Sequence, residues 1–312
     1  MRRHAPWALV LILSATFVLF DAPLDFAYVI PQRLLRLGAM LVGGVCVAWS
    51  AIAFQTLTGN RLLTPAIMGF EAVYLLLQAV LVLGLGSAGM VLLGAQGNFL
   101  LAASVMFGYA WLVHRLLLRE GRHSVYFLLL VGLVLTLVLG SITQFVQLTI
   151  SPGEFSLLQG VSQTSFNRVQ APQLAVSAVL VGVLALCSRR SLATLDVLAL
   201  GREPAMALGV DYLACVRRQL ALIAALVAIS TNLLGPTAFM GVLVANLTYA
   251  LGGTFRHRVT LVLGSAVAMV LFLLAQLLVE HVFNYQTTVG ILINLVCGGY
   301  FLILMLSQRS AS

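Results

Sequence analysis

The stretch VYFLLLVGLVLTLVLGSITQFV, residues 125–146, contains no charged side chain. A membrane-spanning helix needs about 20 apolar residues, because lipid offers no hydrogen bonds and the helix satisfies its own backbone. Similar runs rich in Leu, Val and Ala recur along the whole chain, in which 61% of residues are hydrophobic and 8% are charged. The sequence therefore predicts an all-α polytopic membrane protein.

About ten such runs are predicted to span the membrane, with short polar connections between them. The predicted spans are Trp7–Phe20, Leu34–Phe54, Ala66–Leu85, Phe99–Leu117, Val125–Val146, Leu174–Cys187, Leu220–Leu234, Thr237–Leu251, Val259–Val279 and Val289–Leu306. Residues 1–312 then form a single transmembrane domain. The longest connections are residues 147–173 on one side and residues 188–219 on the other.

All 17 basic residues are arginines, and they are distributed unevenly between the two sides. With the N-terminus inside, fourteen fall on the inner side: Arg2, Arg3, Arg61, Arg115, Arg119, Arg122, Arg189, Arg190, Arg202, Arg217, Arg218, Arg256, Arg258 and Arg309. Only Arg33, Arg36 and Arg168 fall outside. Because basic residues concentrate on the cytoplasmic side of membrane proteins, both termini are predicted to be cytoplasmic. The net charge of +8 thus reflects topology and indicates no nucleic-acid partner.

Several activities are excluded by missing residue types. A P-loop requires a lysine, and the chain has none, so ATP hydrolysis by that route must belong to another polypeptide. The zinc-protease pattern H-E-x-x-H is also missing. The four cysteines lack metal-ligand spacing, so neither a disulfide nor a metal site is expected. The N-terminal run resembles a secretory signal but lacks a convincing cleavage site, so we expect it to remain the first helix.

Several blocks of sequence, in order, carry a resemblance to a known family. They are Arg33-Leu-Leu-Arg36, Gly43-Gly44, Phe54-Gln55, residues 60–69 (NRLLTPAIMG), residues 200–210 (LGREPAMALGV), residues 235–244 (GPTAFMGVLV), Val289-Gly290 and residues 298–301 (GGYF). Together they resemble the permease subunit of type II ABC importers, which take up iron–siderophore complexes, haem and cobalamin. Residues 64–74 (TPAIMGFEAVY) with residues 244–248 (VANLT) are similar to the catecholate-siderophore branch.

The resemblance implies a set of partners. They are cytoplasmic ATPase subunits that bind ATP and Mg, a second permease chain, a periplasmic or lipid-anchored substrate-binding protein, and a ferric siderophore as cargo. The chain itself would then sit in the bacterial inner membrane, bind no cofactor and be no enzyme. Haem or cobalamin as cargo, an identical or different second permease, and an ion-coupled secondary transporter remain open alternatives.

Two outer arginines lie three residues apart at the start of the second span, so both project from one helical face. The resemblance implies that Arg33 and Arg36 dock carboxylates of the binding protein through bidentate pairs; the alternative is snorkelling at a helix end. Arg168 either attracts an anionic cargo or is a solvated loop charge. Cobalamin-type members have a further outer arginine where this chain has Glu280 or His281.

The inner connection, residues 188–219, is expected to contain one or two short helices across the membrane face. Gly201 would separate them, Pro204 would lie in a first turn, and Gly209 would end the second helix. The resemblance implies that the ATPase contacts this segment. The candidate coupling residues are Leu200, Gly201, Arg202, Glu203, Pro204, Ala205, Met206, Leu208 and Gly209, of which Ala205, Met206 and Leu208 would form an apolar knob. The alternative is an amphipathic surface helix without a partner.

Glu71 is the one acid predicted inside a span. An intramembrane carboxylate is either an ion or proton site, or a group hydrogen-bonded to a neighbouring helix. The second interpretation is favoured, because no further acid or intramembrane histidine is available as a relay. Candidate polar groups of the pore or of helix interfaces are Asn167, Asn232, Asn246 and Gln276.

Overall fold

The computed structural model describes residues 5–20, 28–117, 125–237 and 239–309, and its regular elements over these ranges are all helical. They are α1 (Ala5–Leu19), α2 (Val29–Thr58), η1 (Pro65–Met68), α3 (Phe70–Leu117), α4 (Val125–Thr149), α5 (Pro152–Val161), α6 (Ala171–Ser188), η2 (Arg189–Ser191), α7 (Leu192–Leu198), α8 (Arg202–Ala207), α9 (Tyr212–Leu234), α10 (Met240–Gly252), α11 (His257–Leu277), η3 (Leu278–Val282) and α12 (Val289–Arg309). The inner arginines Arg2, Arg3, Arg119 and Arg122 lie outside the described residues.

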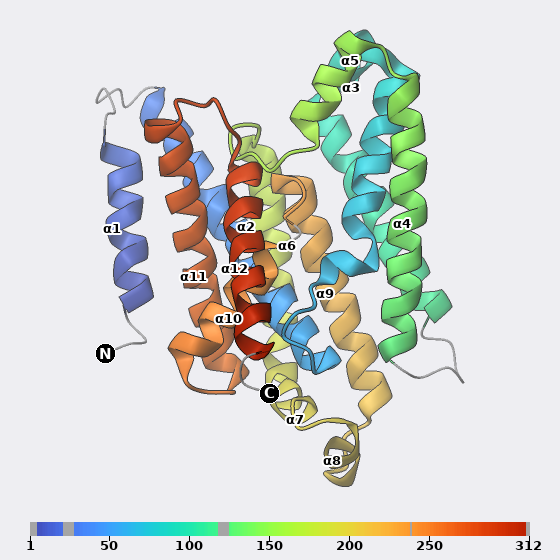
Figure 1. The fold of residues 1–312 in the computed structure, drawn as a ribbon, viewed down its shortest axis with the longest axis vertical. Helices are drawn as coiled ribbons and strands as arrows, with labels where there is room; N and C mark the ends of the chain where they lie inside the picture. Colours follow the sequence, from blue (N-terminus) through green and yellow to red (C-terminus); the bar gives the residue numbers. More distant parts are fainter. Residues whose placement is uncertain (1–4, 21–27, 118–124, 238, 310–312) are drawn as a thin grey trace.

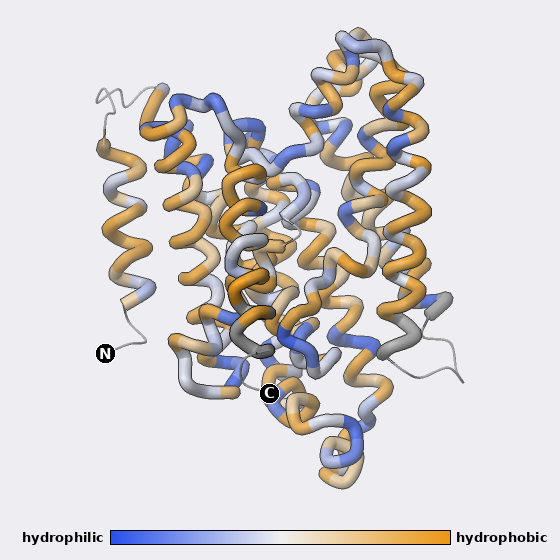
Figure 2. Tube along the Cα trace, viewed as in Figure 1, coloured by the Kyte–Doolittle hydropathy of each residue, from blue (hydrophilic) through white to orange (hydrophobic). Residues whose placement is uncertain are grey.

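The helices have the apolar character of membrane spans. Among the described helices, α2, α3, α4, α6, α9 and α11 are long and apolar enough to cross a membrane, and α1, α10 and α12 contain shorter apolar stretches. Figure 2 shows hydrophobic residues along most of the helices, with hydrophilic residues gathered mainly at the two ends. Each predicted span overlaps a helix. The all-α prediction is therefore confirmed, while the number of crossings stays a prediction.

Helix α3 folds back on itself. Gly86 (φ 63°) and Gly94 (φ 65°) have left-handed backbone conformations that glycine tolerates. The Gln78 side chain donates a hydrogen bond to Asn98 Oδ1 over 3.2 Å, although a straight helix would separate these residues by about 30 Å. The predicted third and fourth spans are thus two arms joined by a helical connection, where the sequence suggested a loop (Figure 1).

The centre of the fold is α2, which packs against α9 and α11. Gly44 brings α2 against the backbone of α11, since a Cβ atom there would lie 3.4 Å from the backbone nitrogen of Met269. Small residues allow such close approach between membrane helices. The two arms of α3 and helix α4 pack on the other side of α9 (Figure 1). This arrangement leaves much of α3 and α4 at the edge of the molecule.

Helix α10 is shorter than the predicted span Thr237–Leu251. It begins at Met240 and has 13 residues, or about 20 Å, which is less than the roughly 30 Å hydrocarbon core. Residues 235–237, which precede it, are not helical. Gly235 has a φ of 94°, and Pro236 cannot donate a backbone hydrogen bond, so the chain is interrupted between α9 and α10.

The two long connections lie at opposite ends of the molecule. The predicted outer stretch contains α5, and the predicted inner stretch contains η2, α7 and α8 (Figure 1). The start of α1 and the end of α12 point toward the end that carries α7 and α8. We call the α5 end the outer end and the α7–α8 end the inner end.

We predict that Gly132→Val destabilises the fold, because α4 approaches η1 closely there. A Cβ atom at Gly132 would lie 2.9 Å from the carbonyl oxygen of Ile67 and 3.1 Å from Met68 Cα, and backbone atoms cannot easily move away. Overpacking of this kind costs about 1–3 kcal/mol. The matched control is Gly140→Val on the same helix, which has no atom within 4 Å of the added Cβ. The measurement is thermal unfolding in detergent, monitored by tryptophan fluorescence. Equal melting temperatures for the two variants would contradict this packing.

Candidate functional site

A groove of about 770 Å³ lies on one side of the molecule. It is lined by η1, α3, α4, α10 and α12, together with the chain before η1. Its lining residues are Asn60, Leu62, Leu63, Thr64, Ala66, Ile67, Glu71, Ala72, Leu75, Leu133, Thr136, Gly140, Thr143, Gln144, Gln147, Phe239, Val242 and Phe301. The groove extends from Asn60, just after the inner end of α2, to Gln147, near the outer end of α4.

The first wall of the groove is an interrupted segment between α2 and α3. Residues 59–69 contain two glycines in left-handed conformations, Gly59 and Gly69. Its backbone carbonyls are bonded by side chains from elsewhere: Arg61 O accepts from Gln55 Nε2 (2.8 Å) and from Asn246 Nδ2 (3.2 Å). Ile67 O and Met68 O accept from hydroxyls of α4 and α3. Non-helical backbone at membrane depth persists only when protein groups satisfy it in this way.

The second interruption, residues 235–237, is bonded to the first turn of α3 and to the loop before α6. The Leu234 carbonyl accepts from the backbone N–H of Ser165 (2.9 Å), and the Pro236 carbonyl accepts from the Thr164 hydroxyl. The backbone N–H of Thr237 donates to Glu71 Oε1 over 2.8 Å. The break between α9 and α10 is therefore held from the outer loop on one side and from the first turn of α3 on the other.

Glu71 lies in the first turn of α3, directly after the first interruption, and bonds the second. Its carboxylate lines the groove and accepts the Thr237 N–H that the break leaves without a helical partner. This geometry supports the favoured interpretation, a carboxylate bonded to a neighbouring element. Asn232 and Asn246 likewise bond between elements, since Asn232 Nδ2 donates to Phe99 O over 2.8 Å.

The polar face of α4 was missed by the sequence analysis. Thr136, Gly140, Thr143 and Gln147 recur every three or four residues and line the groove, together with Gln144. This spacing places them on one helical face within an otherwise apolar span. A search for small and polar residues at helical spacing within each apolar run would have found this stripe.

Arg33 is largely buried at the outer end of α2. Its side chain is 9% exposed, and its Nη1 group donates to Phe17 O (2.6 Å) and Phe20 O (2.8 Å). Its Nη2 group lies 3.2 Å from Glu280 Oε1 in an ion pair. Arg33 thus joins α1, α2 and η3 within the described chain, and its role in docking stays a prediction.

Arg36 has a different environment from Arg33. It is partly exposed and forms a hydrogen bond with the side chain of Tyr285, which also bonds Glu280. Burial raises the pKa of Tyr285, Glu280 acts in the same direction, and Arg36 opposes them. The phenol thus stays neutral at physiological pH. Glu280, one of the two residues predicted to replace an outer arginine, is part of this network, and His281 lies next to it in η3.

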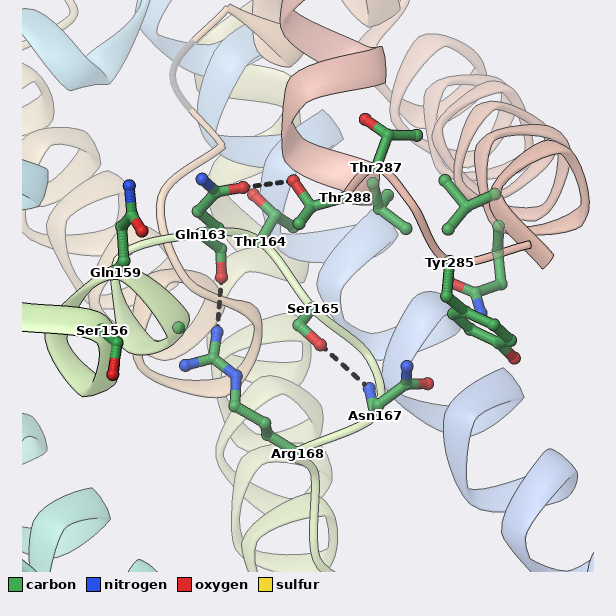
Figure 3. Close-up of a pocket in the computed structure, with 14 residues that line it drawn as sticks. Ser156, Gln159, Gln163, Thr164, Ser165, Asn167, Arg168, Tyr285, Thr287 and Thr288 are labelled. Carbon is green, nitrogen blue, oxygen red and sulfur yellow. Dashed lines mark hydrogen bonds between the residues drawn. The ribbon is translucent and has the colours of Figure 1, made fainter. Parts of the chain in front are cut away.

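Arg168 lies in a polar pocket at the outer end (Figure 3). Its guanidinium donates a hydrogen bond to the carbonyl oxygen of Gln163. Asn167 and Gln276, two of the candidate polar groups, line the same pocket. The structure thus brings Arg168 together with Asn167 and Gln276, and neither Arg33 nor Arg36 is among the residues that line this pocket.

The predicted inner helices are present as α7 and α8. Gly201 (φ 99°) separates them, Pro204 lies in the first turn of α8, and Gly209 (φ 80°) follows its end with its N–H bonded to Met206 O. The expected knob is wrong in one residue, because Ala205 is fully buried against the core. The residues of this segment that are exposed and apolar are Leu200, Met206 and Leu208.

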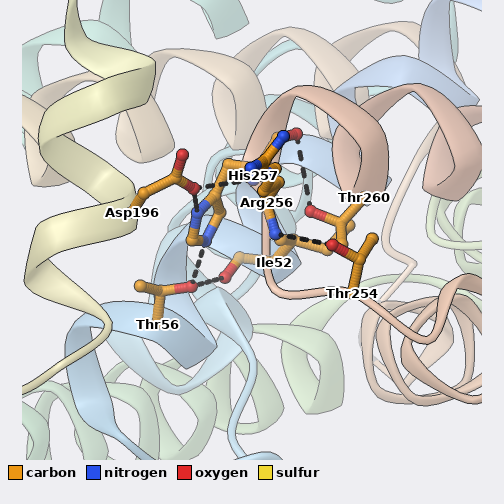
Figure 4. Close-up of polar contacts among 7 residues, drawn as sticks. All are labelled: Ile52, Thr56, Asp196, Thr254, Arg256, His257 and Thr260. Carbon is orange, nitrogen blue, oxygen red and sulfur yellow. Dashed lines mark hydrogen bonds and ion pairs between the residues drawn. The ribbon is translucent and has the colours of Figure 1, made fainter.

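An aspartate of α7 ties the inner segment to two long helices (Figure 4). Asp196 Oδ1 accepts the backbone N–H of His257 at the start of α11 (2.7 Å) and lies 2.6 Å from the Nδ1 atom of the same histidine. His257 Nε2 lies 2.8 Å from the hydroxyl of Thr56 near the end of α2. Because an ionised carboxylate only accepts, Nδ1 carries a proton in this pair. This cluster was not predicted from the sequence, because Thr56 and Asp196 are 140 residues apart and Asp196 and His257 are 61 residues apart.

A family of known transporters matches nearly the whole chain. The FecCD transport family covers residues 8–307, which include the groove, both interruptions and the inner segment. The chain belongs to the FecCD transport family. The resemblance to the permease subunit of type II ABC importers is thereby confirmed, and this FecCD permease is a multi-pass protein of the bacterial membrane rather than an enzyme.

Individual proteins resemble this FecCD permease over most of their length. The petrobactin import system permease protein YclO of Bacillus subtilis (strain 168) is 33% identical over 304 residues, covering 97% of this chain and 96% of the relative. The petrobactin import system permease protein FatC of Bacillus anthracis is 31% identical over 290 residues, covering 93% and 82%. A solved metal-chelate type ABC transporter in an inward-facing conformation shares the fold, with a TM-score of 0.84, 19% identity, and coverage of 97% and 98%.

We predict that the Arg33–Glu280 pair stabilises the outer end of this FecCD permease. Removal of one member of a buried pair leaves a charge without its partner and costs about 3–5 kcal/mol. Arg33→Met and Glu280→Gln should each lower the melting temperature, and the double variant should lose less than the sum of the two. Purely additive losses in such a double-mutant cycle would show that the pair has no coupling energy.

We predict that Asp196→Ala loosens α7 from α2 and α11. The substitution removes the acceptor of two His257 N–H groups, and hydrogen bonds to charged groups contribute about 1.5–3 kcal/mol. Amide hydrogen exchange in α7 should accelerate by roughly tenfold or more. Thr254→Ala is the control, because Thr254 accepts only from the backbone of Arg256 and does not touch α7. Unchanged protection of α7 would show that other contacts hold this helix.

Proposed function

We propose that this FecCD permease is one of two transmembrane subunits of an ABC importer that moves a ferric siderophore, of the catecholate type, across the bacterial inner membrane. The observation that carries the proposal is the whole-length match, at 33% identity, to a protein named as a petrobactin import permease. The groove between the interrupted helices supports it, because it connects the inner and outer ends beside non-helical backbone. Transporter sites are commonly built at such broken helices.

The proposed topology has about ten spans with both termini cytoplasmic. The inner end, with α7 and α8, would then face the cytoplasm, in agreement with the excess of inner arginines. A separate ATPase, which binds ATP and Mg, would contact residues 200–209 through the exposed side chains of Leu200, Met206 and Leu208. Asp196 and His257 would carry its displacement from α7 into α2 and α11.

A second permease would complete the groove from the open side. Many apolar side chains of α4 are exposed in the isolated chain, among them Leu130, Leu137 and Phe145. These apolar faces must be covered by lipid or by another protein. The polar stripe of α4 must instead face a protein surface that leaves space for cargo. A paired permease that contributes a facing wall satisfies both requirements.

A substrate-binding protein is expected to dock at the outer end. Arg36 is the better candidate for a contact with its carboxylates, since it is partly exposed. Arg33 would support that contact indirectly, because both arginines connect to Glu280, one directly and one through Tyr285.

Two alternatives keep the same chain in the membrane. Haem or cobalamin as cargo would change the binding protein and leave the coupling segment as proposed. An ion-coupled transporter would use Glu71, the acid among the residues that line the groove, as its ion site. The second alternative predicts uptake that persists without nucleotide and stops when the ion gradient collapses.

We predict that Leu208→Asp separates ATP hydrolysis from uptake. An aspartate on the exposed tip of the inner segment would place a charge in an apolar contact with the ATPase. In proteoliposomes that contain both permeases, the ATPase and the binding protein, uptake of a ferric catecholate should fall to the level measured without ATP.

The control is Ala193→Asp, which changes an exposed residue of α7 outside the coupling residues. It should leave ATP-driven uptake intact. Wild-type uptake that needs no ATP would contradict the ABC mechanism, and coupled transport by Leu208→Asp at the wild-type rate would remove this segment from it.

A further inference from the structure

A second cavity, separate from the groove, lies at the outer end of the chain. It has a volume of about 380 Å³ and shares no lining residue with the groove. It is formed by α5, the loop of residues 163–168, the end of α11 with η3, and residues 285–289. Figure 3 shows hydroxyl, amide and guanidinium groups from these elements gathered around it. Its volume falls within the range of roughly 300–1,000 Å³ typical of small-molecule sites.

The charge of this outer pocket is positive. Arg168 is a cation among its lining residues, and no lining residue is acidic. A guanidinium carries five N–H groups, and Arg168 uses one nitrogen to bond the Gln163 carbonyl. Several of its N–H groups are therefore left to bind a ligand.

Two glutamines add further donors. The Gln163 side-chain oxygen already accepts from the Thr288 hydroxyl, which leaves the NH₂ group of Gln163 to donate. Gln276 is 1% exposed, lines the pocket, and its Nε2 atom has no hydrogen-bond partner within the described part of the chain. A buried amide donor without an acceptor is unusual, and a ligand oxygen would satisfy it.

We propose that this pocket is a binding subsite for the anionic oxygens of the incoming chelate, carboxylate or catecholate in kind. The inference rests on the proposed function, because it assumes a ferric chelate as cargo. The donors of Arg168, Gln163 and Gln276 match an oxygen-rich anion, whereas a cationic group would find no carboxylate in the pocket.

The loop that forms the subsite is also bound to the interruption between α9 and α10. Ser165 N–H bonds Leu234 O, and the Thr164 hydroxyl bonds Pro236 O. The contact is close, since a Cβ atom on Gly235 would lie 2.9 Å from Gln163 O. Gln163 is followed by Thr164, which bonds Pro236, and Pro236 is followed by Thr237, whose N–H bonds Glu71. An anion held by Gln163 is thus next to the backbone segment that contacts Glu71. A series of contacts therefore runs from the subsite through Thr164 and Pro236 to Thr237 and Glu71, which lines the groove.

The test measures chelate binding to the complete transporter in nanodiscs without its binding protein. The probes are the anionic ferric complex of 2,3-dihydroxybenzoate and a neutral ferric trihydroxamate. Arg168→Gln and Gln276→Met should each weaken binding of the anionic complex by about tenfold, because each removes a hydrogen bond to a charged ligand. Arg168→Lys should retain most of the affinity, and Arg168→Gln should leave binding of the neutral complex unchanged.

Gln32→Met is the matched control for Gln276→Met, since it removes an exposed glutamine at the outer start of α2 that does not line the pocket. It should bind the anionic complex as the wild type does. Wild-type affinity in correctly inserted Arg168→Gln and Gln276→Met would overturn the subsite. So would a loss of binding-protein docking in Arg168→Gln without any loss of chelate affinity, which would assign the pocket to a partner carboxylate. Failure of the wild-type transporter to import any ferric chelate would instead contradict the proposed function.

Discussion

Backbone hydrogen bonding at two helix interruptions is the constraint on which the arrangement of this permease depends. Lipid cannot bond an exposed N–H or C=O group, so each break must be satisfied by protein. Residues 59–69 use side chains of α2, α3, α4 and α10, and residues 235–237 use Glu71 and the outer loop at 164–165. Each bond fixes one element relative to another, so the breaks determine where α3, α4 and α10 lie and hence the shape of the groove.

The same principle explains why a charge is buried near the outer end. Arg33 donates hydrogen bonds to two carbonyl oxygens at the end of α1, Phe17 O and Phe20 O, and forms an ion pair with Glu280. The last four carbonyls of a helix have no partner within it, and an arginine from a neighbouring helix can bond them. Arg33 therefore attaches α1, which is otherwise held mainly by apolar contacts, to α2 and η3.

Much of this organisation was predictable because its causes are local. Uninterrupted apolar runs predict spans, and Gly201 with Pro204 predicts two short inner helices from backbone chemistry alone. Other features depend on contacts between distant residues. Arg33 is paired with Glu280, His257 is bonded to Asp196, and Gln276 shares a pocket with α5 and the 163–168 loop, all over long distances in sequence. The reversal within α3 was predicted as a connection between two spans, but its helical form was not, because Gly86 and Gly94 interrupt an apolar, helix-forming segment only at single residues.

Helix α11 connects the two ends of the molecule in one rigid element. His257 at its start is bonded to α7, and Gln276 near its end lines the outer pocket, about 30 Å away at 1.5 Å per residue. Helix α9 does the same from the end of the inner segment to the break at Gly235. Rigid helices transmit a displacement over such a distance without local rearrangement. Helix α11 therefore links α7 directly to the outer pocket, and α9 links the inner segment to the break whose Thr237 N–H bonds Glu71 in the groove.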